Sequence, residues 1–260
     1  MTMVLAHARC DWRCYEGCSY YAVLAAADDL AAQARNTLTQ AEIQQGWKLL
    51  WDGKTGAGWH TASGEAIPNE SWTIANGILL DHADGGHGHG HSGDLLTDGD
   101  YRNFELSVDF KLASGANSGI KYFVNTDKAN GGDPTIGLEY QLLDDYRHPD
   151  AKLGRDGNRT EASLYDLIPA ARNKPYRLVG EWNTAKIVVR GAHTEHWLNG
   201  VKVLEYERFT PEFRHLVQES KYKSLPNFGE LHHGHIQLQD HGDTASFQNI
   251  KIRVLIDNSR

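Results

Sequence analysis

The chain has 260 residues, 40% of them hydrophobic and 10% aromatic, which is enough to build the core of one large β domain or two small ones. Its formal net charge is -8, and no run of Lys and Arg forms the basic stripe that binds a phosphate backbone, so we expect no nucleic-acid partner. No stretch reaches the ~20 apolar residues of a membrane span, so we expect none.

All three cysteines lie near the N-terminus, at Cys10, Cys14 and Cys18. A helix would place them on one face, but their spacing matches no standard zinc or iron–sulfur motif. An odd number of cysteines cannot all pair within the chain. The rest of the sequence holds no cysteine, so no disulfide framework is expected in the main domain.

Residues 1–45 are predicted to be an N-terminal leader or extension that precedes the main domain. Within them, residues 20–34 contain a short apolar run that ends in Ala-Gln-Ala, the pattern of a signal cleavage site. Asp28 and Asp29 interrupt the run, and an amphipathic helix is the alternative. The segment favours export, so we expect a periplasmic or secreted bacterial protein.

Two places carry signals for helices. Thr39 followed by Glu42 forms a capping box that predicts a helix of one or two turns. Thr210 and Pro211 have the pattern of an N-cap and an N1 proline, so residues 210–226 are predicted to be helical or irregular.

From Trp47 onward, alternation of apolar and polar residues predicts strands. Asn-Gly pairs inside 72–80 and 193–207 predict two hairpin turns. Further strands are predicted at 103–112, 118–125, 137–145, 176–183, 185–191, 233–242 and 245–256, and a polar insertion at 144–163. Short alternating strands with little helix predict an all-β, two-sheet antiparallel sandwich that spans 46–257.

Two of these strands carry unusual polar faces. In 137–145, Glu139 and Gln141 lie opposite three apolar residues, and Asp144 follows at the end. In 233–242 the matching face is His235, Gln237, Gln239 and His241. Side-chain amides both donate and accept hydrogen bonds, which suits sugar hydroxyls. Trp59, Trp182 and Trp197 could supply apolar faces for sugar rings, whereas an ordinary solvated face is the alternative.

Glu139 and Asp144 also form a carboxylate pair, and classical glycosidases use two carboxylates that flank the scissile bond. These two are five residues apart with an expected strand end between them, so they need not share a face. The signal for a standard glycosidase is therefore weak.

The segment 81–94 is rich in Gly and His and could bind a divalent metal through His87, His89 and His91. Imidazole favours zinc, copper or nickel. An ordered metal site also needs supporting groups around its ligands, which Gly-His repeats do not supply. A loop at the rim of a groove is the alternative interpretation.

Eight blocks of sequence resemble, in order, those of the DUF1080 family, also called the 3-keto-disaccharide hydrolase domain. They are "GWKLLWDGKTGAGW", "WTIANGILL", "GDLLT", "YRNFELSVDFKLASGANSGIKYFV", "GLEYQLLDD", "WNTAKIVVRG", "EHWLNG" and "GHIQLQDHGDTASFQNIKI". The resemblance covers roughly residues 46–256. It implies a concanavalin A-like jelly-roll β-sandwich with few short helices, usually exported in glycan-degrading bacteria, and action on sugars oxidised at carbon 3.

A ketone at C3 acidifies the proton on C2, so a general base can remove that proton while the enolate is stabilised. The group on C1 then leaves by β-elimination, and water can add back. This route needs no pair of glycosidase carboxylates, which agrees with the spacing of Glu139 and Asp144.

The resembling blocks imply roles for individual residues. Glu139 or His241 would act as the base, and Lys121, or a metal in its place, would stabilise the enolate. The substrate would be bound by Gln141, Asp144, Gln237, Gln239 and Trp59. Ordinary alternatives are a solvated lysine for Lys121 and a turn-capping histidine for His241.

Two other functions remain open at this level. The domain could be a non-catalytic carbohydrate-binding module, because a fold does not determine a function. It could also sequester metal through the Gly-His segment. The sequence indicates neither the sugar and its linkage nor an oligomeric state.

Overall fold

A computed structural model of the chain describes residues 35–68, 70–83, 93–126 and 136–256. The predicted export segment, the three cysteines and His87, His89 and His91 lie outside the described residues. A compact unit begins at Asn36, ahead of the predicted domain start at residue 46. It includes α2 (Gln40–Gln44), where the reciprocal bonds of Thr39 and Glu42 confirm the capping box.

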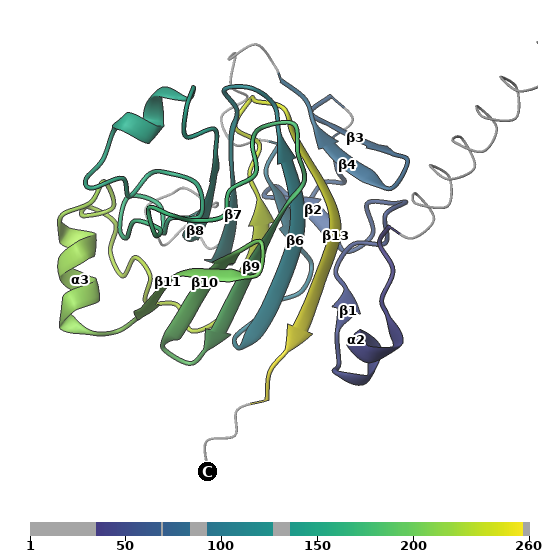
Figure 1. Ribbon diagram of the computed structural model, residues 1–260. Coiled ribbons are helices and arrows are strands. Elements are labelled where there is room, and N and C mark those ends of the chain that lie inside the picture. Colours follow the sequence, from purple (N-terminus) through teal and green to yellow (C-terminus); the bar gives the residue numbers. More distant parts are fainter. Residues whose placement is uncertain (1–34, 69, 84–92, 127–135, 257–260) are drawn as a thin grey trace, which may run out of the picture. The chain divides into compact units, whose positions relative to one another are not determined.

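Two antiparallel sheets make up this unit (Figure 1). The larger has eight strands in the order β11-β10-β9-β6-β13-β4-β3, with β1 beside β13. Its strands are β1 (Lys48–Leu49), β3 (Trp72–Ala75), β4 (Ile78–Asp81), β6 (Phe104–Leu112), β9 (Asn183–Arg190), β10 (His193–Leu198), β11 (Val201–Glu207) and β13 (Ala245–Val254). β13, in yellow, thus runs through the interior of the sheet although it is the last strand described.

The smaller sheet has five strands in the order β2-β5-β12-β7-β8. They are β2 (Trp59–Thr61), β5 (Leu95–Thr97), β7 (Asn117–Val124), β8 (Leu138–Leu143) and β12 (His235–Leu238). The inner faces of the two sheets pack against each other: the ring of Phe104 in β6 meets that of Tyr122 in β7 edge-on, with centroids 6.4 Å apart. The predicted all-β, concanavalin A-like jelly-roll sandwich is confirmed.

Both predicted hairpins are present, and their turns have the required backbone. Asn76 and Gly77 have φ values of 52° and 71°, and Asn199 and Gly200 have 48° and 81°, as a type I′ turn needs at both central positions. The predicted N-cap Thr210 starts α3 (Pro211–Gln218), and its side chain accepts a hydrogen bond from the amide of Phe213.

The strand predicted at 176–183 is wrong, because regular strand structure begins only at Asn183. Gly180 has φ +87°, and the amide of Arg177 donates to the side chain of Asn183 instead of to a neighbouring strand. Local side-chain bonds therefore replace a strand ladder here.

The polar insertion contains the short 3-10 helix η2 (Pro149–Lys152) and continues in the structure to Asp166. It returns along the free edge of β8. The amide of Ala162 donates to the carbonyl of Gln141, and the amide of Tyr165 donates to the carbonyl of Glu139. The edge of β8 is thereby covered, which protects it from pairing with another chain. Within the described ranges no helix is long and apolar enough to cross a membrane.

Candidate active site

Three neighbouring strands carry one row of polar side chains. Glu139 in β8 is paired directly with Lys121 in β7, and Lys121 is paired with Gln237 in β12. Residues that stand opposite each other on adjacent strands share a face, so these three side chains lie side by side on the outer face of the smaller sheet. All three are buried.

A second row lies one pleat along the same face. Gln141 in β8 is paired with Gly119 in β7, and the amide of Gln239, just past the end of β12, donates to the carbonyl of Gly119. Gly119 leaves room between the two glutamines. That space is occupied by the carboxylate of Glu139, since a Cβ on Gly119 would meet its Oε1 at 2.6 Å.

His241 stands at the end of this face. The side-chain amide of Gln141 donates to Oδ1 of Asn117 at 3.0 Å, and Nδ2 of Asn117 lies 3.3 Å from Nε2 of His241. His241 is exposed, in contrast to the buried Glu139. The imidazole is thus connected to the second row through Asn117, which the sequence did not single out.

The three glutamines each keep one buried acceptor without a hydrogen-bond partner: Oε1 of Gln141, Gln237 and Gln239. An unpartnered buried carbonyl oxygen lowers the free energy of unfolding by about 1–3 kcal/mol, so three of them on one face destabilise the fold considerably. Such a cost is typical of groups that are kept for a ligand. Six predicted site residues therefore meet on one face: Glu139, Lys121, Gln141, Gln237, Gln239 and His241.

Asp144 has a different role from the predicted one. Its carboxylate accepts hydrogen bonds from the amides of Gly115, Tyr146 and Arg147, and from the guanidinium of Arg147. Burial opposes its ionisation, but these donors prevail and lower the pKa of Asp144 below its ordinary value. Asp144 thus organises the turn after β8, with both oxygens engaged.

Trp59 does not lie on the polar face. It is 4% exposed, belongs to the hydrophobic core, and its indole N–H donates to the carbonyl of Leu50 at 3.0 Å. Its neighbour His60 has the opposite orientation, because successive residues of a strand alternate between faces. Trp59 is a core residue, so the structure gives it no surface to offer a sugar ring.

The insertion places Tyr165 at the outer end of the first row. Leu164 pairs with Tyr140, and the amide of Tyr165 donates to the carbonyl of Glu139 at 3.0 Å, so Tyr165 stands next to Glu139. The hydroxyl of Tyr165 donates to Asp150 at 2.7 Å. The full row therefore reads Gln237, Lys121, Glu139, Tyr165.

Arg159 and Lys221 surround Tyr165. Arg159 bonds to Asp150 and to Asp166 at 2.9 and 2.6 Å, and the Lys221 ammonium lies 4.2 Å from the centre of the Tyr165 ring. None of these residues was predicted to belong to the site. They come from irregular segments, which carry no period that could assign them to a face.

A second buried carboxyl supports the edge of β8. Glu161 is fully buried and its Oε2 accepts from the amide of Leu143 at 2.8 Å. Burial, and then the charge of Asp145, raise the pKa of Glu161 well above its ordinary value, although Lys174 opposes this. Lys174 pairs with Asp145 at 2.8 Å.

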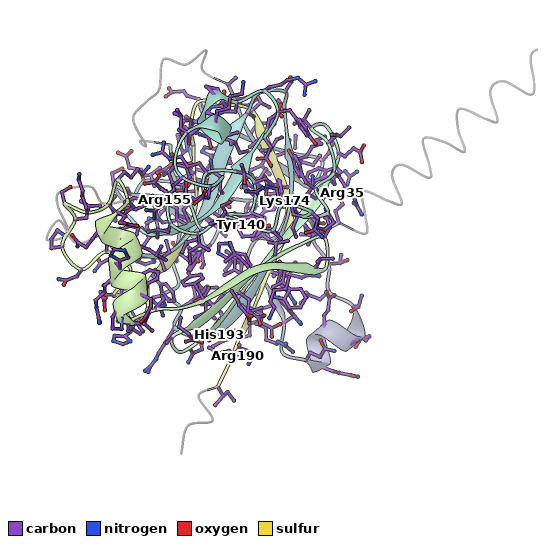
Figure 2. All side chains as sticks on the ribbon, turned by 60° about the vertical axis from the view of Figure 1, so that its left-hand side comes forward. Arg35, Tyr140, Arg155, Lys174, Arg190 and His193 are labelled. Carbon is purple, nitrogen blue, oxygen red and sulfur yellow. The ribbon has the colours of Figure 1, made fainter. Side chains whose placement is uncertain are left out.

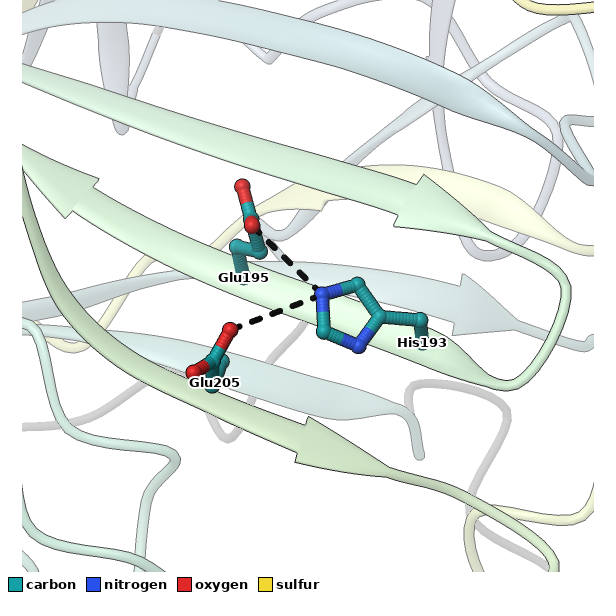
Figure 3. Close-up of side chains that lie close together, drawn as sticks. All are labelled: His193, Glu195 and Glu205. Atoms are coloured by element: carbon teal, nitrogen blue, oxygen red, sulfur yellow. Dashed lines mark hydrogen bonds and ion pairs between the residues drawn. The ribbon is translucent and has the colours of Figure 1, made fainter.

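One group among the described residues has metal-ligand geometry: His193, Glu195 and Glu205 on the hairpin of β10 and β11 (Figure 3). It lies on the other sheet, and Figure 2 shows His193 well separated from Tyr140. The ammonium of Lys202 already pairs with Glu195 at 3.2 Å and with Glu205 at 2.6 Å. The Lys202 ammonium thus neutralises these carboxylates, so the group is an ion-pair network.

A pocket of about 320 Å³ lies beside α3, lined by residues that include Arg214, Phe228 and Glu230. It contains none of the polar residues of the smaller sheet, and its rim is held by the ion pair of Arg214 with Glu230 at 2.9 Å. We therefore place the candidate active site on the polar face, where titratable and amide groups meet, and not in this pocket.

Comparison with known proteins agrees with this fold. A family model described as a 3-keto-alpha-glucoside-1,2-lyase-like domain matches residues 46–253. A 3-keto-disaccharide hydrolase of Bacteroides thetaiotaomicron is 38% identical over 259 residues, which cover 88% of each chain.

Two solved structures of Parabacteroides distasonis proteins assigned as glycosyl hydrolases are similar. The first has a TM-score of 0.74 and 26% identity and covers 85% of this chain and 100% of its own. The second has a TM-score of 0.61 and 28% identity, with 80% and 99% covered.

Proposed function

Because this chain belongs to the 3-keto-alpha-glucoside-1,2-lyase-like family, we propose that it cleaves 3-keto-glycosides, including 3-keto-disaccharides, by elimination across C1 and C2. The relative from Bacteroides thetaiotaomicron is itself named a 3-keto-disaccharide hydrolase. The observation that carries the proposal is the row in which the carboxylate-bearing Glu139 stands directly beside the cationic Lys121. A base and a cation side by side are what enolate formation needs.

Glu139 is the base that removes the C2 proton. Its carboxylate lies at the centre of the polar face, over Gly119 and between the glutamines of the second row. His241 is exposed and lies at the end of the face, where it orients Asn117 and through it Gln141. The central position therefore favours Glu139 over His241 as the base.

Lys121 stabilises the negative charge that develops on the C3 oxygen. It needs no metal for this role, although a bound cation could serve the same purpose. Gln141, Gln237 and Gln239 line the same face, and their side-chain amides are of the kind that binds sugar hydroxyls. The face thus combines one base, one electrophile and three hydroxyl-binding groups.

The reaction balances in two steps. The electrons of the C2–H bond form the C1–C2 double bond while those of the C1–O bond leave with the departing oxygen, which gives an unsaturated ketone and an alcohol. Water then adds to C1 and a proton returns to C2, so the net reaction is hydrolysis. Both steps use the same base, first to accept a proton and then to return it.

The test follows the C2 proton. Wild type is incubated with a 3-keto-disaccharide in deuterated water, and we expect product release and deuterium at C2. Glu139→Gln should lower kcat by ~10²–10⁴ and abolish the exchange. His241→Ala should lower kcat less, and Glu181→Gln, which changes an exposed carboxylate, serves as the control.

Two outcomes would contradict the proposal. Loss of exchange in His241→Ala but not in Glu139→Gln would make His241 the base. A wild-type protein that binds the sugar without releasing product would instead be a non-catalytic carbohydrate-binding module, the alternative that the sandwich fold also allows.

A further inference from the structure

Lys221 belongs to the turn that follows α3, far in sequence from β7 and β8. Its backbone amide donates to Oδ2 of Asp166 at 2.7 Å, and Oδ1 of the same carboxylate accepts from Arg159 at 2.6 Å. Asp166 thus joins this turn to the insertion that runs along β8. The backbone of Lys221 is therefore fixed relative to Glu139.

The side chain of Lys221 extends to the end of the polar row. Its ammonium lies 4.2 Å from the ring centre of Tyr165 and 5.1 Å from that of Tyr222. Tyr165 is the direct neighbour of Glu139, to whose carbonyl it donates. Lys221 is exposed to solvent over part of its length, whereas its charged end lies against two aromatic rings.

The surroundings of Lys221 make its ammonium a better acid than an ordinary lysine. Burial of its charged end lowers the pKa of Lys221; Glu139 opposes this most strongly, whereas the nearby cations Lys121 and Arg159 lower the pKa again. The other proton donors at this end of the row are poor acids. Burial followed by the bond to Asp150 raises the pKa of Tyr165.

The order of charged groups along the row matches the order of atoms in the substrate. Glu139 stands between Lys121 on one side and Tyr165 with Lys221 on the other. In a 3-keto-glycoside, C2 stands between the carbonyl carbon C3 and the carbon C1 that bears the leaving group. When Glu139 lies beside C2 and Lys121 beside the C3 oxygen, C1 and its leaving group face the end of the row at which Lys221 lies.

We propose that Lys221 is the general acid that protonates the departing glycosidic oxygen. As the C1–O bond breaks, its electron pair takes a proton from the Lys221 ammonium, which becomes a neutral amine, while Glu139 has received the C2 proton. The amine regains its proton from water before the next turnover. This assignment rests on the proposed function, because it needs an elimination with a leaving oxygen.

The experiment compares two leaving groups. Wild type and Lys221→Met are assayed with a 3-keto-glucoside of a sugar alcohol, which needs protonation, and with one of 4-nitrophenol, which leaves readily as an anion. We expect Lys221→Met to lower kcat/KM by ~10²–10⁴ for the first substrate and by less than about tenfold for the second. Lys223→Met, which changes an exposed lysine of the same turn, should have the kcat/KM of wild type with both substrates.

Lys221→Arg separates proton donation from charge alone, because guanidinium keeps the positive charge but does not give up its proton near neutral pH. We expect it to be as impaired as Lys221→Met with the sugar-alcohol substrate. Full activity of Lys221→Arg, or equal losses with both leaving groups, would overturn the assignment while the proposed function stands. Failure of wild type to cleave either substrate would overturn both.

Discussion

The carboxylate of Glu139 occupies the space beside Gly119 that a methyl group would need, with Oε1 only 2.6 Å from that position. A glycine in the interior of β7 weakens a strand, so its presence marks a place where another group approaches closely. Here the approaching group is the proposed base.

Gly119→Ala should separate activity from stability. The atom that the new methyl group meets is the far end of a flexible side chain, so the fold can adapt at a cost we expect to stay below about 1 kcal/mol. The carboxylate must move, however, and a misplacement of about 1 Å in catalytic geometry can cost ~10²-fold in rate. Thermal unfolding and kcat are measured together, and a variant with wild-type kcat would show that the position of Glu139 over Gly119 does not matter.

The buried amides offer a matched pair of variants. Gln239→Leu removes an unpartnered acceptor on the polar face, and Gln248→Leu removes one on β13 in the other sheet. Each change should leave the free energy of unfolding unchanged or raise it by up to about 1–3 kcal/mol, because it removes a buried acceptor that has no partner. Only Gln239→Leu should raise KM, by roughly tenfold, the worth of one hydrogen bond. Equal KM values in the two variants would remove Gln239 from substrate binding.

Trp59→Phe should destabilise the protein without a specific effect on substrate affinity. The change leaves a cavity in the core, and the carbonyl of Leu50 loses the hydrogen bond from the indole N–H. Together these should cost about 2–4 kcal/mol in the free energy of unfolding, measured by denaturant titration. A selective rise in KM at unchanged stability would instead return Trp59 to the sugar-binding role suggested by the sequence.

His196 should make stability depend on pH. It is completely buried between the sheets, where Nδ1 lies 3.0 Å from the carbonyl of Ala162. A carbonyl can only accept, so Nδ1 carries the proton and Nε2 accepts from the hydroxyl of Tyr122 at 2.8 Å. Burial lowers the pKa of His196 from 6.5 to about 4, against the opposing effect of that carbonyl.

The direction of this dependence follows from proton uptake. Below pH 6.5 the unfolded chain binds a proton at His196, whereas the folded chain does so only near pH 4. Stability should therefore be complete above pH 6.5 and decline by about 3 kcal/mol as the pH falls to 4. In His196→Gln this part of the decline should vanish, and an unchanged pH profile would exclude His196 as its source.

Alternation along the chain was enough to predict the sandwich and most of its polar face. Glu139 and Gln141, like Gln237 and Gln239, are two residues apart, so each pair had to share a face once its strand formed. The position of Asp144 was harder to predict, because its bonds to three backbone amides depend on a turn that has no period. Trp59 lies in a strand of three residues, too short to show which of its faces is apolar.

Lys221 and Tyr165 could not be predicted for a further reason. The approach of Lys221 to Glu139 depends on Asp166, a single carboxylate that joins the insertion to the turn after α3, and that of Tyr165 depends on the backbone bond between the insertion and β8. Contacts between irregular segments far apart in sequence follow from the closed fold and have no local signature. The sequence therefore indicated the strands of the site but not the groups that flank them.

The position of β13 has a consequence for how the protein is made. This strand, close to the end of the described chain, lies between β6 and β4 and also pairs with β1, so the larger sheet stays split until β13 arrives. During synthesis on the ribosome, the edges of β4 and β6 that pair with β13 stay unpaired until β13 has been made. Unpaired strand edges promote aggregation. A nascent chain that stalls before residue 245 should need a chaperone, whereas one released after residue 254 can close its own sheet.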